Sequence, residues 1–142
     1  MKVSDAMSRD VRVANPNQSI RDVASSMAQI DAGAIPVAEN DRLIGMVTDR
    51  DIAIRGVAAG KVPGTPVREV MSPDIRYCYE DEDLKHVAQN MAELRVRRLP
   101  VLDRAKRLVG ILSLGDIALS EKPKTSGETI AGVSQHGGPH SQ

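Results

Sequence analysis

A hydroxyl and a carboxylate recur three residues apart at two places in this chain of 142 residues. Thr48 precedes Asp51 and Ser113 precedes Asp116, each time after a short Arg-Leu-aliphatic-Gly segment. If each pair begins a helix, the free N–H groups and the hydroxyl can donate to a phosphate while the carboxylate accepts from ribose hydroxyls. The same atoms can instead serve only to cap the helix, and the residues alone leave both interpretations open.

Arginines stand close to both motifs. Arg95, Arg97 and Arg98 precede an apolar run, and Arg50 lies inside the first motif. The planar guanidinium group matches phosphate oxygens well, so these residues are candidates for a phosphate clamp. Salt bridges on a solvated surface would use the same residues, and the sequence does not decide between the two roles.

The two motifs belong to an internal repeat with an offset of about 64 residues. Segments 3–12, 23–28, 35–37 and 42–53 return in order as 67–76, 87–92, 99–101 and 107–118. This repeat predicts two small units related by pseudo-twofold symmetry and packed against each other. We expect a first unit at 1–58, a Gly/Pro linker at 59–66, a second unit at 67–122 and a disordered tail at 123–142.

The periodicity of apolar residues predicts the order strand, helix, strand, strand, helix in each copy, and therefore an α+β fold with an α/β-like order. Residues 20–28 and 84–92 have the apolar spacing of a helix face. Runs at 11–13 and 75–79 predict the first strands, and runs at 34–37, 43–47, 99–102 and 108–112 predict the paired ones. Both hydroxyl-carboxylate motifs then fall where the last strand of a copy gives way to a helix.

The composition argues against several classes of partner. The chain has 19 basic and 19 acidic residues, two Tyr, and neither Phe nor Trp, so it lacks the charge and the stacking surfaces of a nucleic-acid-binding protein. It has no apolar run of the ~20 residues that a membrane span needs, and it begins directly with repeat sequence. The single cysteine, Cys78, is expected to be a small apolar strand residue, and a cytoplasmic location is expected.

Catalytic and metal-binding motifs are absent from the sequence, so an enzyme is not expected. The chain has no Gly-rich phosphate loop, no nucleophile elbow and no His/Cys set with the spacing of metal ligands. The acidic run 80–83 precedes a predicted helix, where negative charge is favourable. A metal or partner site is the alternative for that run.

Taken together, the two copies resemble a tandem pair of CBS domains, also called a Bateman module. The resemblance rests on the Pro-Val strands at 35–37 and 99–101 and on the Gly-x-x-Ser/Thr-x-x-Asp ends at 45–51 and 110–116, and it covers about residues 1–122. The segment 48–55 is further similar to stand-alone bacterial CBS-pair signal-transduction proteins, including those linked to hypoxic or stress responses.

The resemblance implies a regulatory protein that binds an adenosine-containing ligand in two clefts between the copies: AMP, ADP, ATP, NAD or S-adenosylmethionine. It implies ribose contacts from Asp51 and Asp116, and ribose or phosphate contacts from Thr48 and Ser113. The other implied ligand-binding residues lie at the adenine edge or border the clefts: Ala32, Gly33, Ala34, Val96, Arg97, Arg98, Asp10, Arg12, Asp74 and Arg76. Arg97 and Arg98 match positions where the family places phosphate contacts, so we expect charged nucleotides first in the cleft of Ser113 and Asp116.

The resemblance also implies a disc-like homodimer formed through helices, signalling to a downstream protein that the sequence does not identify. Apolar residues beside the two motifs are available for such a face: Ile52, Ile54, Ile117 and Leu119. The alternative function is a ligand-free interaction or oligomerisation module in which the duplicated motif only caps helices.

Overall fold

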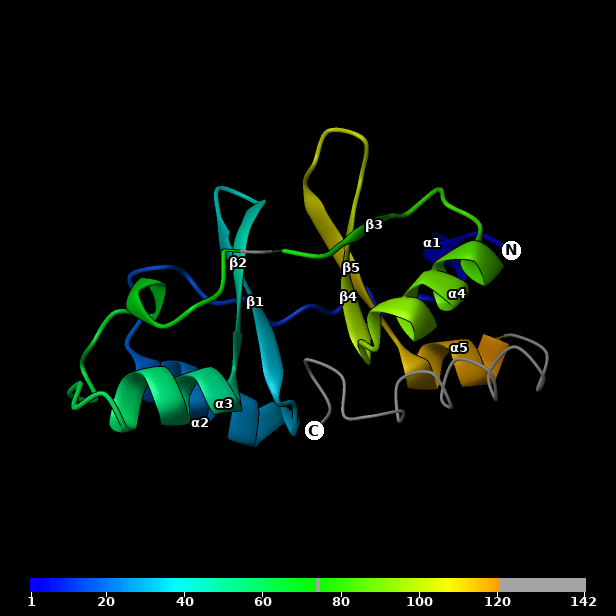
Figure 1. Ribbon diagram of the computed structural model, residues 1–142. Coiled ribbons are helices and arrows are strands. Elements are labelled where there is room, and N and C mark those ends of the chain that lie inside the picture. Colours follow the sequence, from blue (N-terminus) through cyan, green and yellow to red (C-terminus); the bar gives the residue numbers. More distant parts are fainter. Residues whose placement is uncertain (74, 121–142) are drawn as a thin grey trace. The chain divides into compact units, whose positions relative to one another are not determined.

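The computed structural model describes residues 1–73 and 75–120, and these form two compact units (Figure 1). One unit is Arg12–Ile75, which we call the Thr48 unit. In the other, the Ser113 unit, Met1–Val11 packs with the described part of the chain that follows Ile75, residues 76–120. The units therefore divide the chain differently from the repeats, because the opening segment of each repeat folds with the other repeat. The expected linker at 59–66 lies inside the Thr48 unit, and the expected tail at 123–142 lies outside the described residues.

The Thr48 unit contains an antiparallel hairpin flanked by helices. Its elements are α2 (Ile20–Ile30), β1 (Ala34–Glu39), β2 (Arg42–Thr48), α3 (Asp49–Asp51), the π-helical turn η1 (Ile52–Val57) and the 3₁₀ turn η2 (Val67–Glu69). The predicted helix and hairpin are confirmed, and positive φ angles at Asn40 and Asp41 make the tight turn that joins the strands. The strand predicted at 11–13 is wrong. Only Ala14 pairs with β1, because a turn at 15–17 follows at once.

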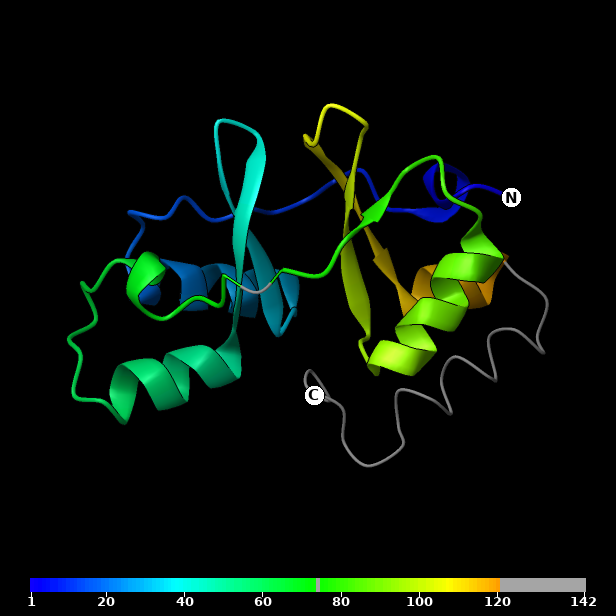
Figure 2. The same ribbon diagram turned by 45° about the horizontal axis from the view of Figure 1, so that its top comes forward.

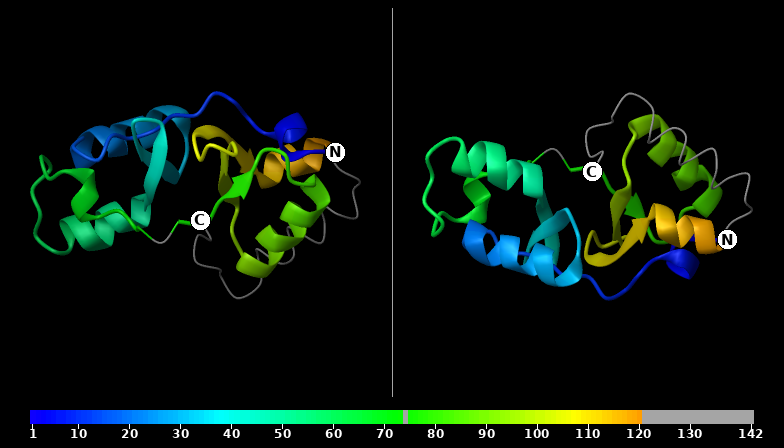
Figure 3. Two further views of the ribbon diagram at one scale, coloured as in Figure 1. Left: turned by 90° about the horizontal axis from the view of Figure 1, so that it is seen from above. Right: turned by 90° about the horizontal axis from the view of Figure 1, so that it is seen from below.

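The Ser113 unit contains a three-stranded sheet in the order β3-β4-β5, with helices packed on it (Figure 2). Its elements are α1 (Val3–Ala6), β3 (Cys78–Tyr79), α4 (Leu84–Leu94), β4 (Arg98–Leu102), β5 (Leu108–Ser113) and α5 (Leu114–Ser120). Strand β3 runs parallel to β4, and β4 runs antiparallel to β5. The strand predicted at 75–79 is confirmed only for its last two residues. Helix α1, from the very start of the chain, contacts α4, α5 and β5 (Figure 3).

Each unit completes its sheet with a Met-Ser segment from the other repeat. Ser8 and Ile111 of β5 exchange two N–H···O bonds, both of 2.9 Å. Ser72 and Met46 of β2 do the same, with bonds of 2.8 and 2.9 Å. We call 3–8 and 67–72 the exchanged segments. The repeat reveals that these segments are equivalent but does not predict that they change places.

The glycine of each Arg-Leu-aliphatic-Gly run lies under an exchanged segment. A Cβ atom on Gly110 would stand 2.6 Å from the Met7 Sδ and 2.9 Å from the Ser8 carbonyl oxygen. A Cβ atom on Gly45 would stand 2.7 Å from the Met71 Sδ and 3.0 Å from the Ser72 oxygen. The distances to both sulfur atoms and to the Ser8 oxygen are shorter than Cβ atoms adopt, and the distance to the Ser72 oxygen is at the lower limit. A side chain at either position would therefore displace part of the exchanged segment, which favours glycine.

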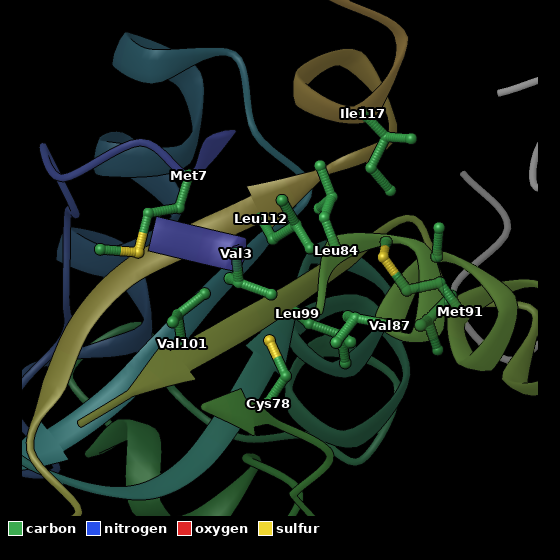
Figure 4. Close-up of a cluster of buried hydrophobic side chains, with 12 residues drawn as sticks. Val3, Met7, Cys78, Leu84, Val87, Met91, Leu99, Val101, Leu112 and Ile117 are labelled. Carbon is green, nitrogen blue, oxygen red and sulfur yellow. The ribbon is translucent and has the colours of Figure 1, made fainter. Parts of the chain in front are cut away.

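The core of the Ser113 unit is aliphatic and includes residues of the exchanged segment (Figure 4). Val3, Val101 and Leu112 are fully buried together there. Cys78 is a strand residue, as predicted, and it lies in the same core. Its burial, followed by the nearby charge of Glu82, raises the pKa of its thiol to about 12. This thiol is therefore protonated near neutral pH. Within 1–73 and 75–120, no helix has the length and apolar character that crossing a membrane requires.

Substituting Gly110 tests the contact with the exchanged segment. We expect Gly110→Ala to lower the free energy of unfolding by about 1–3 kcal/mol, because the new methyl group must displace both the Met7 side chain and the backbone at Ser8. Urea unfolding measures this loss. The matched control is Gly64→Ala, where the methyl group would meet nothing within 4 Å and the change should stay below about 1 kcal/mol. Equal stability of the two variants would contradict the assigned contact.

Candidate functional site

Both hydroxyl-carboxylate motifs form capping boxes at the start of a helix. Thr48 Oγ1 accepts the Asp51 N–H at 3.0 Å, and Asp51 Oδ2 accepts the Thr48 N–H at 2.9 Å. Ser113 Oγ and Asp116 Oδ2 repeat these bonds at 3.1 and 2.9 Å. Two otherwise unpaired N–H groups are thereby satisfied in each copy. The capping role is confirmed, and it leaves a ligand-binding role possible for the remaining atoms.

Each cap uses one oxygen of its carboxylate. The Asp51 side chain is 19% exposed, and its Oδ1 lies 3.9 Å from the Arg55 Nε. The Asp116 residue is partly exposed, and none of the described residues donates a hydrogen bond to its Oδ1. An ionised carboxylate has acceptor capacity on both oxygens, so each motif can accept further donors without giving up its cap.

The same backbone bond places a loop beside each motif. The Asp49 N–H donates to the Gly33 oxygen at 3.0 Å, and the Leu114 N–H donates to the Arg97 oxygen at 3.1 Å. The strand pairs Ala34 with Thr48 and Arg98 with Ser113 give the same placement. Each unit thus brings together one group of predicted site residues. The Thr48 set is Ala32, Gly33, Ala34, Thr48, Arg50 and Asp51, and the Ser113 set is Val96, Arg97, Arg98, Ser113 and Asp116. Val96 is buried, whereas Arg97 and Arg98 are exposed.

The residues in and directly beside the two sets carry opposite net charge. Asp31, Asp49 and Asp51 accompany one arginine, Arg50, at the Thr48 set. At the Ser113 set, Arg95, Arg97 and Arg98 accompany one aspartate, Asp116. In the Thr48 unit Asp49 Oδ1 also accepts the Arg50 N–H at 2.8 Å. Its equivalent, Leu114, has no carboxylate to offer the Gly115 N–H. An anion is therefore bound more favourably beside the Ser113 set, where positive charge is in excess.

The remaining predicted site residues precede the sets in the sequence, Asp10 and Arg12 before the Thr48 set and Asp74 and Arg76 before the Ser113 set. Arg12 Nη1 donates to the Gln29 side chain at 3.5 Å, and Arg76 Nη1 donates to the Leu94 carbonyl oxygen at 3.4 Å. Both arginines thus reach the C-terminal part of a helix in their own unit, where positive charge is favourable. Asp10 is exposed in the Ser113 unit and, within the described residues, makes no hydrogen bond or ion pair with Ser113 or Asp116. Asp74 lies outside those residues.

Arg55 is a residue whose role the sequence analysis missed. Its Nη1 donates to the carbonyl oxygens of Met71 at 3.3 Å and Val70 at 3.5 Å, while its Nε faces Asp51. The spacing of four residues between Asp51 and Arg55 was a signal for the ion pair. The contact with 70–71 had no local signal, because those residues belong to the exchanged segment.

The acidic run 80–83 has structural partners. Asp83 caps α4 by accepting the His86 N–H at 3.3 Å, which confirms the helix-start interpretation. Asp81 binds Arg104, whose hydrogen bonds lower the pKa of the Asp81 carboxyl. The Arg104 guanidinium also lies over the Tyr79 ring, 4.2 Å from its centre. In the part of the chain that is described, no group of three His, Cys, Asp or Glu side chains is arranged to hold a metal ion.

Comparison with known sequences identifies the family of each repeat. The CBS domain family matches residues 3–56 and 67–120. The chain is also 43% identical over 133 residues to the CBS domain-containing protein YhcV of Bacillus subtilis (strain 168), which covers 93% of this chain and 94% of that protein. These matches confirm the resemblance drawn from the repeat.

Solved CBS-pair structures share the fold, which confirms the predicted α+β class. Hypoxic Response Protein I, solved with two coordinated zinc ions, has a TM-score of 0.77 and 35% identity, covering 86% of this chain and 100% of that one. CBSX2 in complex with AMP has a TM-score of 0.75 and 26% identity, covering 84% and 94%. The CBS domain pair of MJ0100, in complex with 5-methylthioadenosine and S-adenosyl-L-methionine, has a TM-score of 0.72 and 28% identity, covering 84% and 98%.

Removing one capping hydroxyl tests its structural role. We expect Ser113→Ala to lower the free energy of unfolding by about 1 kcal/mol, because the Asp116 N–H loses its acceptor. Chemical denaturation gives the value. The control is Ser25→Ala on the exposed face of α2, where alanine is the better helix former and no loss is expected. An unchanged stability of Ser113→Ala would rule out the cap as a stabilising element.

Proposed function

Because this chain belongs to the CBS domain family and carries two copies of the domain, we propose that it is a regulatory protein whose CBS pair binds an adenosine-containing ligand. The AMP complex of CBSX2 and the S-adenosyl-L-methionine complex of MJ0100 support this ligand class. In this chain, the main support for the proposal is the Asp116 carboxylate, which uses only Oδ2 for the helix cap and lies next to the loop at 96–98 that contains Arg97 and Arg98.

The groups around Ser113 match the parts of an adenine nucleotide. Asp116 Oδ1 would accept ribose hydroxyls, and the Ser113 hydroxyl, which already accepts the Asp116 N–H, keeps its own hydrogen to donate. Arg97 and Arg98 would hold phosphate through charge-assisted hydrogen bonds. The backbone at Val96 would lie at the adenine edge. Hydroxyl, carboxylate and guanidinium groups serve binding here, so we assign regulation rather than turnover.

We further propose that the two units prefer ligands of different charge. The Thr48 set would bind ribose through Thr48 and Asp51, but Asp31 and Asp49 add negative charge to its surroundings. Each extra phosphate on the ligand is therefore less favourable at Asp51 than at Asp116. ATP should prefer the Ser113 unit, and AMP should discriminate less between the two.

Ligand binding is testable by calorimetry on folded protein purified free of nucleotide. We expect AMP and ATP to bind, and Asp116→Asn to weaken the tighter ATP site at least about tenfold, because an amide NH₂ replaces the free acceptor oxygen. The double variant Arg97→Gln/Arg98→Gln should weaken ATP more than AMP and reduce the salt dependence of ATP binding. Arg107→Gln, an exposed change on the same unit, is the matched control and should bind both as the wild type does.

The outcomes separate this function from its alternative. Failure of AMP, ATP and S-adenosylmethionine to bind at millimolar concentration would overturn the adenosine-sensor proposal. A ligand-free interaction module would then account for the duplicated capping boxes.

We also propose a homodimer formed through exposed apolar side chains on η1 and α5. Ile54 is 54% exposed and Leu119 is 90% exposed. Two further residues expected at a dimer contact are unsuitable: Ile117 is fully buried, and Ile52 is partly buried against the core of its own unit. Aliphatic side chains left in water at this level favour association with another apolar surface.

Light scattering after size-exclusion chromatography tests the homodimer. We expect the wild type to have twice the mass of one chain and Ile54→Glu/Leu119→Glu to have the mass of one, since burying two carboxylates in an apolar contact is unfavourable. Val62→Glu, at a loop position whose 66% exposure lies between those of Ile54 and Leu119, should remain dimeric. A wild type with the mass of one chain at micromolar concentration would refute the dimer.

A further inference from the structure

The Arg55 side chain spans two features of the Thr48 unit. On one side its Nε lies 3.9 Å from Asp51 Oδ1, the oxygen that the capping box leaves free. On the other side its Nη1 donates to the carbonyl oxygens of Val70 and Met71. One guanidinium group therefore contacts the proposed ribose-binding carboxylate and the end of the exchanged segment at the same time.

The exchanged segment is built into the Thr48 unit at several points. Val67 and Val70 are fully buried in its core. The Met71 Sδ lies against Gly45, and Ser72 exchanges two hydrogen bonds with Met46 of β2. The chain leaves the unit soon afterward, at Ile75. Arg55 therefore binds carbonyl oxygens close to the C-terminal end of the unit.

Among the described residues, the Ser113 unit has no equivalent of this arrangement. Aligning Thr48 with Ser113 and Asp51 with Asp116 places Ser120 opposite Arg55. A serine hydroxyl has neither the reach nor the charge of a guanidinium group. Within 1–73 and 75–120, no arginine therefore links segment 3–8 to Asp116 in the way that Arg55 links 67–72 to Asp51.

We propose that Arg55 is a positioning residue that couples ligand binding at Asp51 to the stability of the exchanged segment 67–72. This inference rests on the proposed function of the Thr48 unit. Ribose hydroxyls that donate to Asp51 Oδ1 hold the carboxylate in one place, and the carboxylate in turn holds Arg55 in the position from which it reaches Val70 and Met71. Coupling of this kind is reciprocal, so Arg55 also favours binding at Asp51.

Hydrogen exchange followed by mass spectrometry tests the coupling, with AMP as the ligand. In the wild type, saturating AMP should slow exchange in peptide 67–73 about two- to fivefold more than in α2 of the same unit, the range expected of a partly exposed charge contact. Comparison with α2 removes any general stabilisation of the unit by bound ligand. In Arg55→Gln this extra protection should vanish, and Arg55→Lys, which keeps the charge, should restore part of it.

Calorimetry on the same proteins separates this inference from the function on which it rests. Arg55→Gln should bind AMP two- to fivefold more weakly at one site, and Arg21→Gln, an exposed change on α2, should bind as the wild type does. If the wild type binds AMP but peptide 67–73 gains no extra protection, or gains it equally in Arg55→Gln, the coupling is refuted and the proposed function stands. If the wild type binds no AMP, the coupling is refuted, and the proposed function is refuted with it only if ATP and S-adenosylmethionine also fail to bind.

Discussion

The contact between a Met-Ser segment and the glycine-bearing strand of the opposite repeat is the constraint on which the rest of this structure depends. Each contact consists of two backbone hydrogen bonds and a methionine side chain laid across a glycine, and it closes the outer edge of a hairpin sheet. An open strand edge exposes unpaired N–H and C=O groups, and units of about 60 residues have little core with which to offset that cost. Valines from the same segments, Val3 in one unit and Val67 in the other, complete the two cores. The same segments therefore close the sheet edge and complete the core of each unit, and they do so only because each folds with the opposite repeat.

This contact also explains how the candidate site is positioned. Ile111 is held by Ser8, and two residues later Ser113 begins the capping box; Met46 is held by Ser72, and Thr48 follows in the same way. Strands β2 and β5 thus fix the position of the hydroxyl and carboxylate that follow them. One oxygen of each carboxylate accepts a backbone N–H. A cap and a ligand contact are not competing interpretations of these residues, because the two oxygens of one carboxylate can serve both.

Features that depend on neighbouring residues could be predicted from the sequence, whereas features that depend on distant ones could not. The faces of α2 and α4, both hairpins and the caps at Thr48 and Ser113 follow from local spacing, and all of them are present. The exchange of segments could not be foreseen, because Met7-Ser8 and Met71-Ser72 are the same dipeptide, so either would fit either glycine. The contact of Arg55 with Val70 and Met71 was missed for the same reason. Ile117 was expected at the surface but is buried, because α5 turns this residue into the core beside Val3 and Leu112.

The interchange of opening segments has a consequence for how such a protein could arise. A lone repeat of this design would leave its glycine-bearing strand uncovered, and it would be completed by the opening segment of a second chain. Gene duplication that joins two repeats makes the contact between opening segment and strand intramolecular. A short connection then gives the segment a high effective concentration near the strand. The fused copies can then diverge at residues that neither contact the exchanged segments, nor fill the cores, nor form the helix caps. Arginines beside one motif and aspartates beside the other are differences of that permitted kind.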